Sequence, residues 1–138
     1  MKTITSLKQL EKCGLKELEQ LFRKGSANKF PSGDADGVVL LEPAFTKKFG
    51  ELIWKGKNFN LQKMELTNRI LGLRLILGKL RKGPSFLDGK QCLVIDYTKT
   101  SWEARDVIDE LREISRGVFL GRAYRNGIYF ASFALKQA

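Results

Sequence analysis

The sequence predicts a mainly β fold, a small antiparallel barrel with an N-terminal helix and one short inserted helix. Two observations favour the barrel: short segments between closely spaced turn signals fill the chain after Asn60, and residues 125–127 have the chemistry of a hairpin turn. Helical periodicity in residues 7–22 adds the N-terminal helix. A chain of 138 residues with 43% hydrophobic residues suits one domain with a substantial core.

The N-terminal helical segment carries apolar residues at helical intervals. Ser6 and Gln9 have the spacing of a capping box. Gly14 interrupts the pattern, so the better helix covers residues 15–24. We expect residues 1–30 to form a helical segment that packs on a barrel of residues 31–138, in one domain overall.

The strands are predicted from short β-branched or alternating segments between turn signals. A turn-rich stretch, residues 31–37, precedes a first strand at 38–41, and residues 45–53 have the spacing of a short basic amphipathic helix. Asn126-Gly127 supplies the two positive-φ residues of a type I′ turn. Further strands are expected from about residue 57 and at residues 64–70, 71–80, 90–98, 118–125 and 128–136.

Residues 100–114 fit two patterns. Thr100 and Glu103 have capping-box spacing, and apolar residues follow at helical intervals. Alternation from residue 107 onward also fits a strand. Periodicity alone does not decide between these interpretations.

Histidine is absent from the sequence, which removes the commonest general base and the commonest metal ligand. Cys13 and Cys92 lack metal-ligand spacing. We therefore expect no metal and no cofactor, and any catalysis would depend on carboxylates, Lys, Tyr or Cys. No signal peptide and no membrane-spanning stretch is recognised, so a cytoplasmic protein is expected, with peripheral contact to a membrane as a further option.

The charge is concentrated in the middle of the chain. The net charge is +10, and residues 45–82 hold ten basic and two acidic residues, a net charge of +8. A basic face of this kind attracts anionic membrane surfaces and nucleic acids, although net charge alone also simply favours solubility. Oligomeric state is not predicted.

Several short motifs follow one another along the chain: Trp54-Lys-Gly-Lys57 with Phe59, Asn68, Gly83-Pro-Ser85, Asp88-Gly-Lys90, Asp96-Tyr97, Asp109-Glu-x-Arg-Glu113 and Phe119-Leu-Gly121. In this order they resemble a group of small lipocalin-like proteins, from about Leu15 to Leu135. The Gly-x-Trp-x-Gly lipocalin-like domains are more distantly similar, since this chain keeps Trp54-x-Gly56 but has Leu52 at the position of the first glycine. The resemblance implies a small closed antiparallel barrel with an N-terminal helix and often an apolar interior. It also favours a strand over residues 109–115, after a brief helix near 101–106.

A binding role for the interior is the leading hypothesis, with a hydrophobic or amphiphilic ligand, such as a lipid, that has an anionic head group. Asp96 and Tyr97 alternate at the end of a strand, so one of them points inward. An inward carboxylate would need a partner, and Arg112 or Arg122 could pair with it, either as a structural salt bridge or as a ligand anchor. The candidate ligand-binding residues are Trp54, Lys57, Asp96, Tyr97, Arg112 and Arg122.

Two alternatives remain open. An isomerase or cyclase would use Asp96, Tyr97 or Glu110 as acid and base, and the group Asp109, Glu110 and Glu113 supplies further carboxylates. A nucleic-acid-binding barrel would use the basic residues around Trp54 together with exposed aromatic rings. No nucleophile is nominated, so the enzymatic hypothesis is weaker than the ligand-binding hypothesis.

Overall fold

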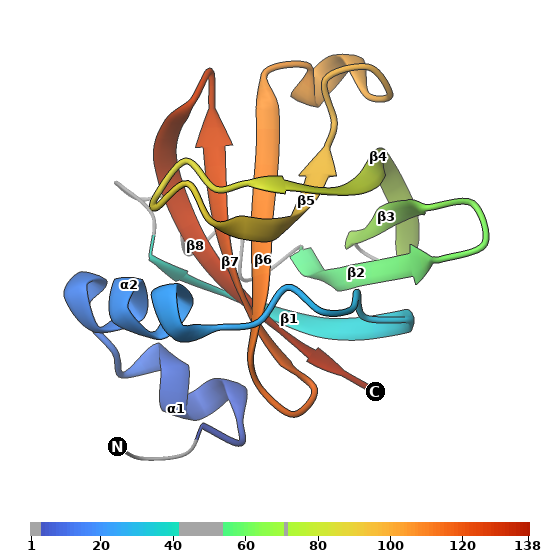
Figure 1. Ribbon diagram of the computed structural model, residues 1–138. Coiled ribbons are helices and arrows are strands. Elements are labelled where there is room, and N and C mark those ends of the chain that lie inside the picture. The colour runs from blue at the N-terminus through green and yellow to red at the C-terminus, as the bar shows by residue number, and fades with distance from the viewer. Residues whose placement is uncertain (1–3, 42–53, 71) are drawn as a thin grey trace.

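In the described part of the chain, eight antiparallel strands close into a barrel, and two short helices lie together against one side of it (Figure 1). The computed structural model describes residues 4–41, 54–70 and 72–138. Strands that follow one another in the chain pair with each other, and the last pairs with the first. The strands are β1 (Gly33–Leu41), β2 (Trp54–Asn60), β3 (Glu65–Ile70), β4 (Leu73–Pro84), β5 (Gln91–Asp96), β6 (Val107–Ser115), β7 (Val118–Arg125) and β8 (Ile128–Gln137). The mainly β fold class predicted from the sequence is confirmed.

The N-terminal helices are α1 (Leu7–Glu11) and α2 (Leu15–Lys24), separated at Gly14 as predicted. The backbone N–H of Ser6 donates to Oε1 of Gln9 at 3.0 Å, which is half of the predicted capping box. None of the described helices has the length and apolar character needed to cross a membrane.

The core has two layers because alternate residues of a strand face opposite sides of the sheet. On β5, Leu93 and Ile95 face the barrel interior, whereas Cys92 and Val94 face outward. The outward residues of β5, β7 and β8 pack against buried side chains of the two helices, among them Phe22. The helices therefore cover an apolar outer face that would otherwise meet water.

Strand β1 starts earlier than the sequence predicted, at Gly33 rather than at residue 38. Its turn-type residues fit a strand because their side chains alternate: Ala35 is buried, while Asp34 accepts a hydrogen bond from Asn58 and Asp36 pairs with Arg69 on the outside. The prediction of a turn over residues 31–37 was wrong for this reason.

The ambiguous stretch forms a strand. A single 3₁₀ turn at Trp102–Ala104, labelled η1, leads into β6, so the interpretation favoured by the family resemblance is confirmed. The hairpin between β7 and β8 is confirmed as well, with Asn126 at φ 52° and Gly127 at φ 78°. The helix predicted at residues 45–53 lies outside the described residues.

Candidate functional site

Trp54 and Lys57 both face the barrel interior because β2 is irregular between them. Strict alternation would place residues three positions apart on opposite faces. The pairing of β2 with β3 shifts its register between Trp54 and Gly56, and Lys55 is exposed. Gly56 has φ 133°, and a Cβ at this position would collide with the carbonyl oxygen of Ala35. The bulge therefore requires glycine and brings the indole and the amine to the same cavity.

Lys57 is the centre of a buried polar cluster. Its Nζ donates to Oδ1 of Asn68 at 2.7 Å, to the hydroxyl of Tyr97 at 2.7 Å and to Oδ2 of Asp109 at 3.1 Å. Nδ2 of Asn68 donates to the Tyr97 hydroxyl at 3.0 Å, and that hydroxyl donates to Asp109 at 3.2 Å. Nε1 of Trp54 donates to Asn68 at 3.0 Å. We call these five residues the Lys57 cluster.

Aromatic rings surround the charged end of Lys57. Its Nζ lies 5.1 Å from the ring centre of Phe133, 5.3 Å from that of Tyr97 and 5.5 Å from that of Trp54. Rings at these distances attract a cation through their quadrupole. Phe133 also meets Trp54 edge to face, with ring centres 5.7 Å apart.

The Lys57 cluster forms the polar end of an otherwise apolar cavity of about 320 Å³ inside the barrel. Small side chains, including Ala123 and Ala131, leave this space between the larger ones. Pockets for small ligands combine such apolar walls with a few convergent polar groups. Other residues that line the cavity are Val39, Ile70, Ile76, Val107 and Phe130.

Burial changes the acidity of two groups in the cluster. Burial lowers the pKa of Lys57 from its ordinary value, and the nearby Asp109 carboxylate opposes this effect without cancelling it. Burial, followed by the charge of Asp109, raises the pKa of Tyr97 well above its ordinary value. Tyr97 therefore stays protonated and can donate, while Lys57 releases its proton more readily than a lysine in water.

Asp96 lies on the outside of the barrel. Its carboxylate accepts from the backbone N–H of Thr98 at 2.9 Å and pairs with Arg81 at 3.1 Å. The residue that points inward at this strand end is Tyr97. The partner of Asp96 is thus Arg81, not Arg112 or Arg122.

Arg112, Arg122 and Glu110 also lie on the outer side of the sheet, in the layer between the strands and the segments that cover them. Arg112 binds both carboxylate oxygens of Asp88 at 2.8 Å and is 2% exposed. Glu110 accepts from Oγ of Ser85 at 2.6 Å. The guanidinium of Arg122 lies 4.2 Å from the ring centre of Tyr129. None of these three side chains lines the interior cavity described above.

Of the predicted site residues, Trp54, Lys57 and Tyr97 come together. Asp109 was predicted only as one of three neighbouring carboxylates, not as the acidic partner of these residues. A signal was present: Asp109 alternates with Val107 and Leu111, which places it on the apolar, inward face of its strand.

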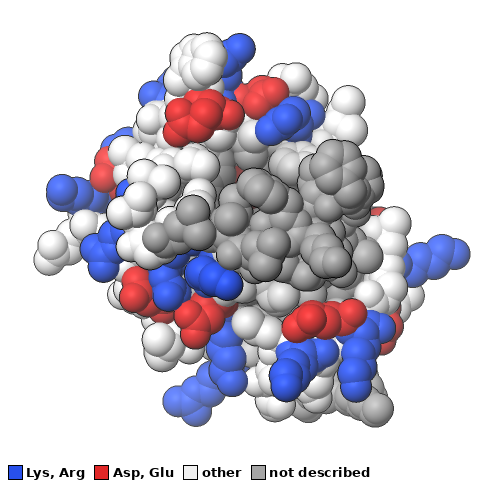
Figure 2. All heavy atoms as spheres, turned by 180° about the vertical axis from the view of Figure 1, so that it is seen from behind, with Lys and Arg blue, Asp and Glu red and all other residues white. Residues whose placement is uncertain are grey.

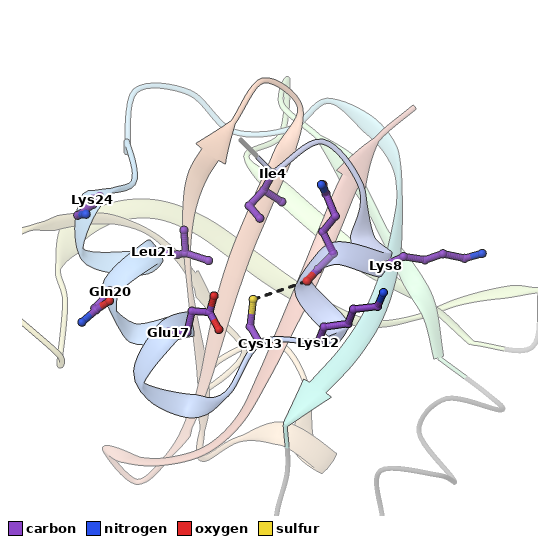
Figure 3. A pocket seen from close by; sticks show the side chains of 9 residues that line it. Ile4, Lys8, Lys12, Cys13, Glu17, Gln20, Leu21 and Lys24 are labelled. Carbon is purple, nitrogen blue, oxygen red and sulfur yellow. Dashed lines mark hydrogen bonds between the residues drawn. The ribbon is translucent and has the colours of Figure 1, made fainter. Parts of the chain in front are cut away.

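A second hollow, of about 590 Å³, lies between α1 and α2 on the outer surface (Figure 3). Its lining combines apolar residues, among them Ile4 and Leu21, with polar ones such as Lys8, Glu17 and Lys24. Among the residues drawn, the dashed hydrogen bond runs from Sγ of Cys13 to the carbonyl of Gln9 at 3.6 Å. Because this bond does not join the polar side chains to one another, whereas those of the Lys57 cluster are linked and buried, the interior cavity is the stronger candidate site.

Three basic residues of the middle strands are paired with acidic residues on the outer surface. Arg69 binds Asp36, Lys79 binds Glu65, and Arg81 binds Asp96. Figure 2 shows lysine and arginine side chains interspersed with acidic ones on the face that it presents. The concentration of positive charge in the sequence therefore does not become a continuous basic patch on that face.

No protein-family model and no curated protein matches the chain. A solved structure, described as a protein from Thermomonospora curvata, is similar with a TM-score of 0.65 and 16% sequence identity. The similarity covers 91% of this chain and 88% of that one. At this identity the likeness supports the barrel fold alone.

Proposed function

We propose that the protein binds a small hydrophobic or amphiphilic molecule inside the barrel, with the polar end of the molecule at the Lys57 cluster. The observation that carries the proposal is the convergence of buried polar groups at one wall of an apolar cavity. A buried ion pair often stabilises a fold no better than apolar residues of similar size. Folding alone therefore gives little reason to place Lys57 and Asp109 here, whereas ligand recognition does.

The charge of the cluster favours an uncharged polar group on the ligand. The charge of Lys57 is balanced by Asp109 at 3.1 Å, so an anionic head group would meet a carboxylate as well as an amine. A hydroxyl or carbonyl group can exchange hydrogen bonds with the cluster without that repulsion. From the sequence, an anionic head group was predicted instead, and ligand titrations can distinguish an anionic head group from an uncharged one.

A matched series of ligands tests the proposal: cinnamyl alcohol, cinnamamide and cinnamate share one apolar body and differ in the head group. Calorimetric titration and native mass spectrometry would measure affinity and stoichiometry. We expect one molecule of the alcohol or amide to bind per chain, and cinnamate to bind more weakly. If cinnamate binds most tightly, the hypothesis of a ligand with an anionic head group is supported instead. If none of the three compounds binds, the interior does not accept ligands of this size and the proposal is wrong.

Fluorescence would place the bound ligand. Trp54 lines the cavity, while Trp102 is 77% exposed, so a Trp102→Phe background leaves the interior indole as the reporter. Binding in the cavity should change the emission of Trp54. Ala123→Leu should fill the cavity and abolish the response, whereas Leu73→Phe, which enlarges an exposed side chain, should preserve it.

The alternatives receive less support from the geometry. Of the three acid-base candidates, only Tyr97 lines the cavity, because Asp96 and Glu110 lie on the outer side of the sheet. Nucleic-acid binding by the basic segment around Trp54 would need the rings of that segment as exposed stacking platforms, but Phe59 is 3% exposed and Trp54 packs against the interior core.

A further inference from the structure

Lys57 combines three features that an amine needs in order to react with a carbonyl compound. Its Nζ borders an apolar cavity that can hold the compound. Asp109 lies at 3.1 Å, where it can take the proton of the ammonium group, and Tyr97 lies at 2.7 Å as a further proton donor. Burial also lowers the pKa of Lys57, which increases the fraction of neutral amine.

We infer that Lys57 forms an imine with an aldehyde or ketone held in the cavity. This inference rests on the proposed function, because the cavity must first accept the carbonyl compound. It goes further in assigning a ligand class and a covalent step to a named atom.

The reaction balances without an oxidant or a reductant. Lys57 gives a proton to Asp109, and the lone pair of Nζ attacks the carbonyl carbon. The new C–N bond forms as the C=O π bond breaks, and the oxygen takes a proton from Asp109 or Tyr97, which gives a carbinolamine. Nitrogen then loses its excess proton to the cluster, the hydroxyl group leaves as water with a proton returned by the cluster, and the nitrogen lone pair forms the C=N bond of a protonated imine. The net change is ammonium plus carbonyl to protonated imine plus water.

The position of Lys57 distinguishes it from the neighbouring Lys55. The two residues lie on the same strand, but Lys55 is exposed, whereas Lys57 is 3% exposed and held by three hydrogen bonds. A carbonyl compound bound in the cavity would have its reactive carbon beside one amine of the two. Proximity of this kind raises the effective concentration of the reactants.

Reductive trapping tests the inference. The protein is incubated at neutral pH with cinnamaldehyde and sodium cyanoborohydride, which converts an imine into a stable secondary amine. Intact mass spectrometry counts the adducts, and peptide mapping locates them. We expect one fast adduct on Lys57, loss of that adduct in Lys57→Arg, and no change in the matched control Lys55→Arg.

A noncovalent arm separates this inference from the proposed function. Cinnamyl alcohol has the same body but no carbonyl group, so its binding reports the cavity alone. Binding of the alcohol without a preferred adduct on Lys57 would overturn the imine and leave the binding proposal standing. If neither the alcohol nor the aldehyde is held by the protein, both fail.

The wild-type chain provides a second measurement in case Lys57→Arg does not fold. Adduct formation at Lys57 should saturate with cinnamaldehyde, because a bound complex precedes the reaction, and excess cinnamyl alcohol should inhibit it. At exposed lysines the rate should rise in proportion to the aldehyde concentration. Nonsaturating labelling spread evenly over the lysines would contradict the inference.

Discussion

At the residue scale, the pair of Lys57 and Asp109 determines the character of the interior. Their side chains are 3% and 7% exposed, so water screens the interaction little. Each group depends on the other, because a buried charge without a partner costs several kcal/mol. The hydrogen bonds from Lys57 to Asn68 and Tyr97 satisfy the rest of the ammonium group.

A double-mutant cycle should reveal this dependence. Lys57→Met leaves Asp109 without its cation and should lower the free energy of unfolding by about 3–5 kcal/mol, whereas Lys57→Met with Asp109→Leu should recover most of that loss. Urea denaturation measures both. Lys79→Met, which breaks the surface pair with Glu65, should cost about 1 kcal/mol or less. Strictly additive effects at positions 57 and 109 would contradict the coupling.

Part of this arrangement could be predicted from residues alone. Trp54, Lys57 and Tyr97 were nominated as candidates, and they do line one cavity, although their role in binding stays a prediction. The pairing of Lys57 with Asp109 joins residues 52 positions apart, which a single sequence does not specify. The inward direction of Trp54 also depends on the bulge at Gly56, which interrupts the alternation of side chains along β2.

At the element scale, the connection between β4 and β5 is fixed to the outer side of β6 by the polar contacts of two side chains, Arg112 and Glu110. Arg112 on β6 binds Asp88 and also donates to the carbonyl of Phe22 in α2 at 3.1 Å. Glu110 accepts from the backbone N–H of Phe86 at 2.8 Å. The buried guanidinium thus joins a strand, a loop and a helix, a structural role rather than contact with the cavity.

This contact predicts an acid-sensitive contribution to stability. The hydrogen bonds from Arg112 lower the pKa of Asp88 from 3.8 to about 2. A depressed folded-state pKa gives stability that is fully present above the ordinary pKa and is lost as the pH falls toward 2. The difference corresponds to about 2 kcal/mol.

Chemical denaturation of the wild-type chain and of the Asp88→Asn variant between pH 5 and pH 2 would measure this contribution of Asp88 to stability. The wild type should lose about 2 kcal/mol more than the variant over this range. Asp36→Asn is the control, because it makes the same substitution at a surface carboxylate whose side chain is 74% exposed. Parallel curves for the wild type and Asp88→Asn would contradict the assignment.

Elements were predictable where local chemistry determines them. The Asn126-Gly127 turn and the break at Gly14 are local, and both were predicted. Strand β1 was placed too late because its aspartates and glycines have turn propensity, and the pairing with β2 and β8 overrides it. Long-range pairing of this kind is not encoded in a short window of sequence.

At the scale of the whole molecule, closure of the sheet and partial filling of the interior have different origins. The meander of strands was predictable from the rhythm of strands and turns, and its closure into an antiparallel barrel from the family resemblance. A hollow interior was not, because it depends on which residues meet across the barrel. Phe133 occupies the space beside Gly121, where a Cβ would collide with its ring, while Ala123 and Ala131 leave space next to it.

Because the surface is charged and the candidate site is buried, ligand binding at the two places should depend on salt to different degrees. Exposed charges are screened over about 8–10 Å at physiological ionic strength, whereas buried groups are screened much less. Binding of cinnamyl alcohol at the Lys57 cluster should therefore change by less than about twofold between low and physiological salt.

A mixed-sequence oligonucleotide should behave differently. The net charge of +10 can attract it at low salt, but nonspecific phosphate contacts weaken steeply as salt rises. Anisotropy with a labelled oligonucleotide and calorimetry with the alcohol, in the same buffers, would compare the two. Alcohol binding that falls as steeply as oligonucleotide binding would place the ligand on the charged surface. Oligonucleotide binding that persists at physiological salt would instead support the nucleic-acid alternative. Nonspecific attraction between phosphates and the surface charges should be weak at that salt concentration, because the ions screen it and because Arg69, Lys79 and Arg81 are already paired with carboxylates.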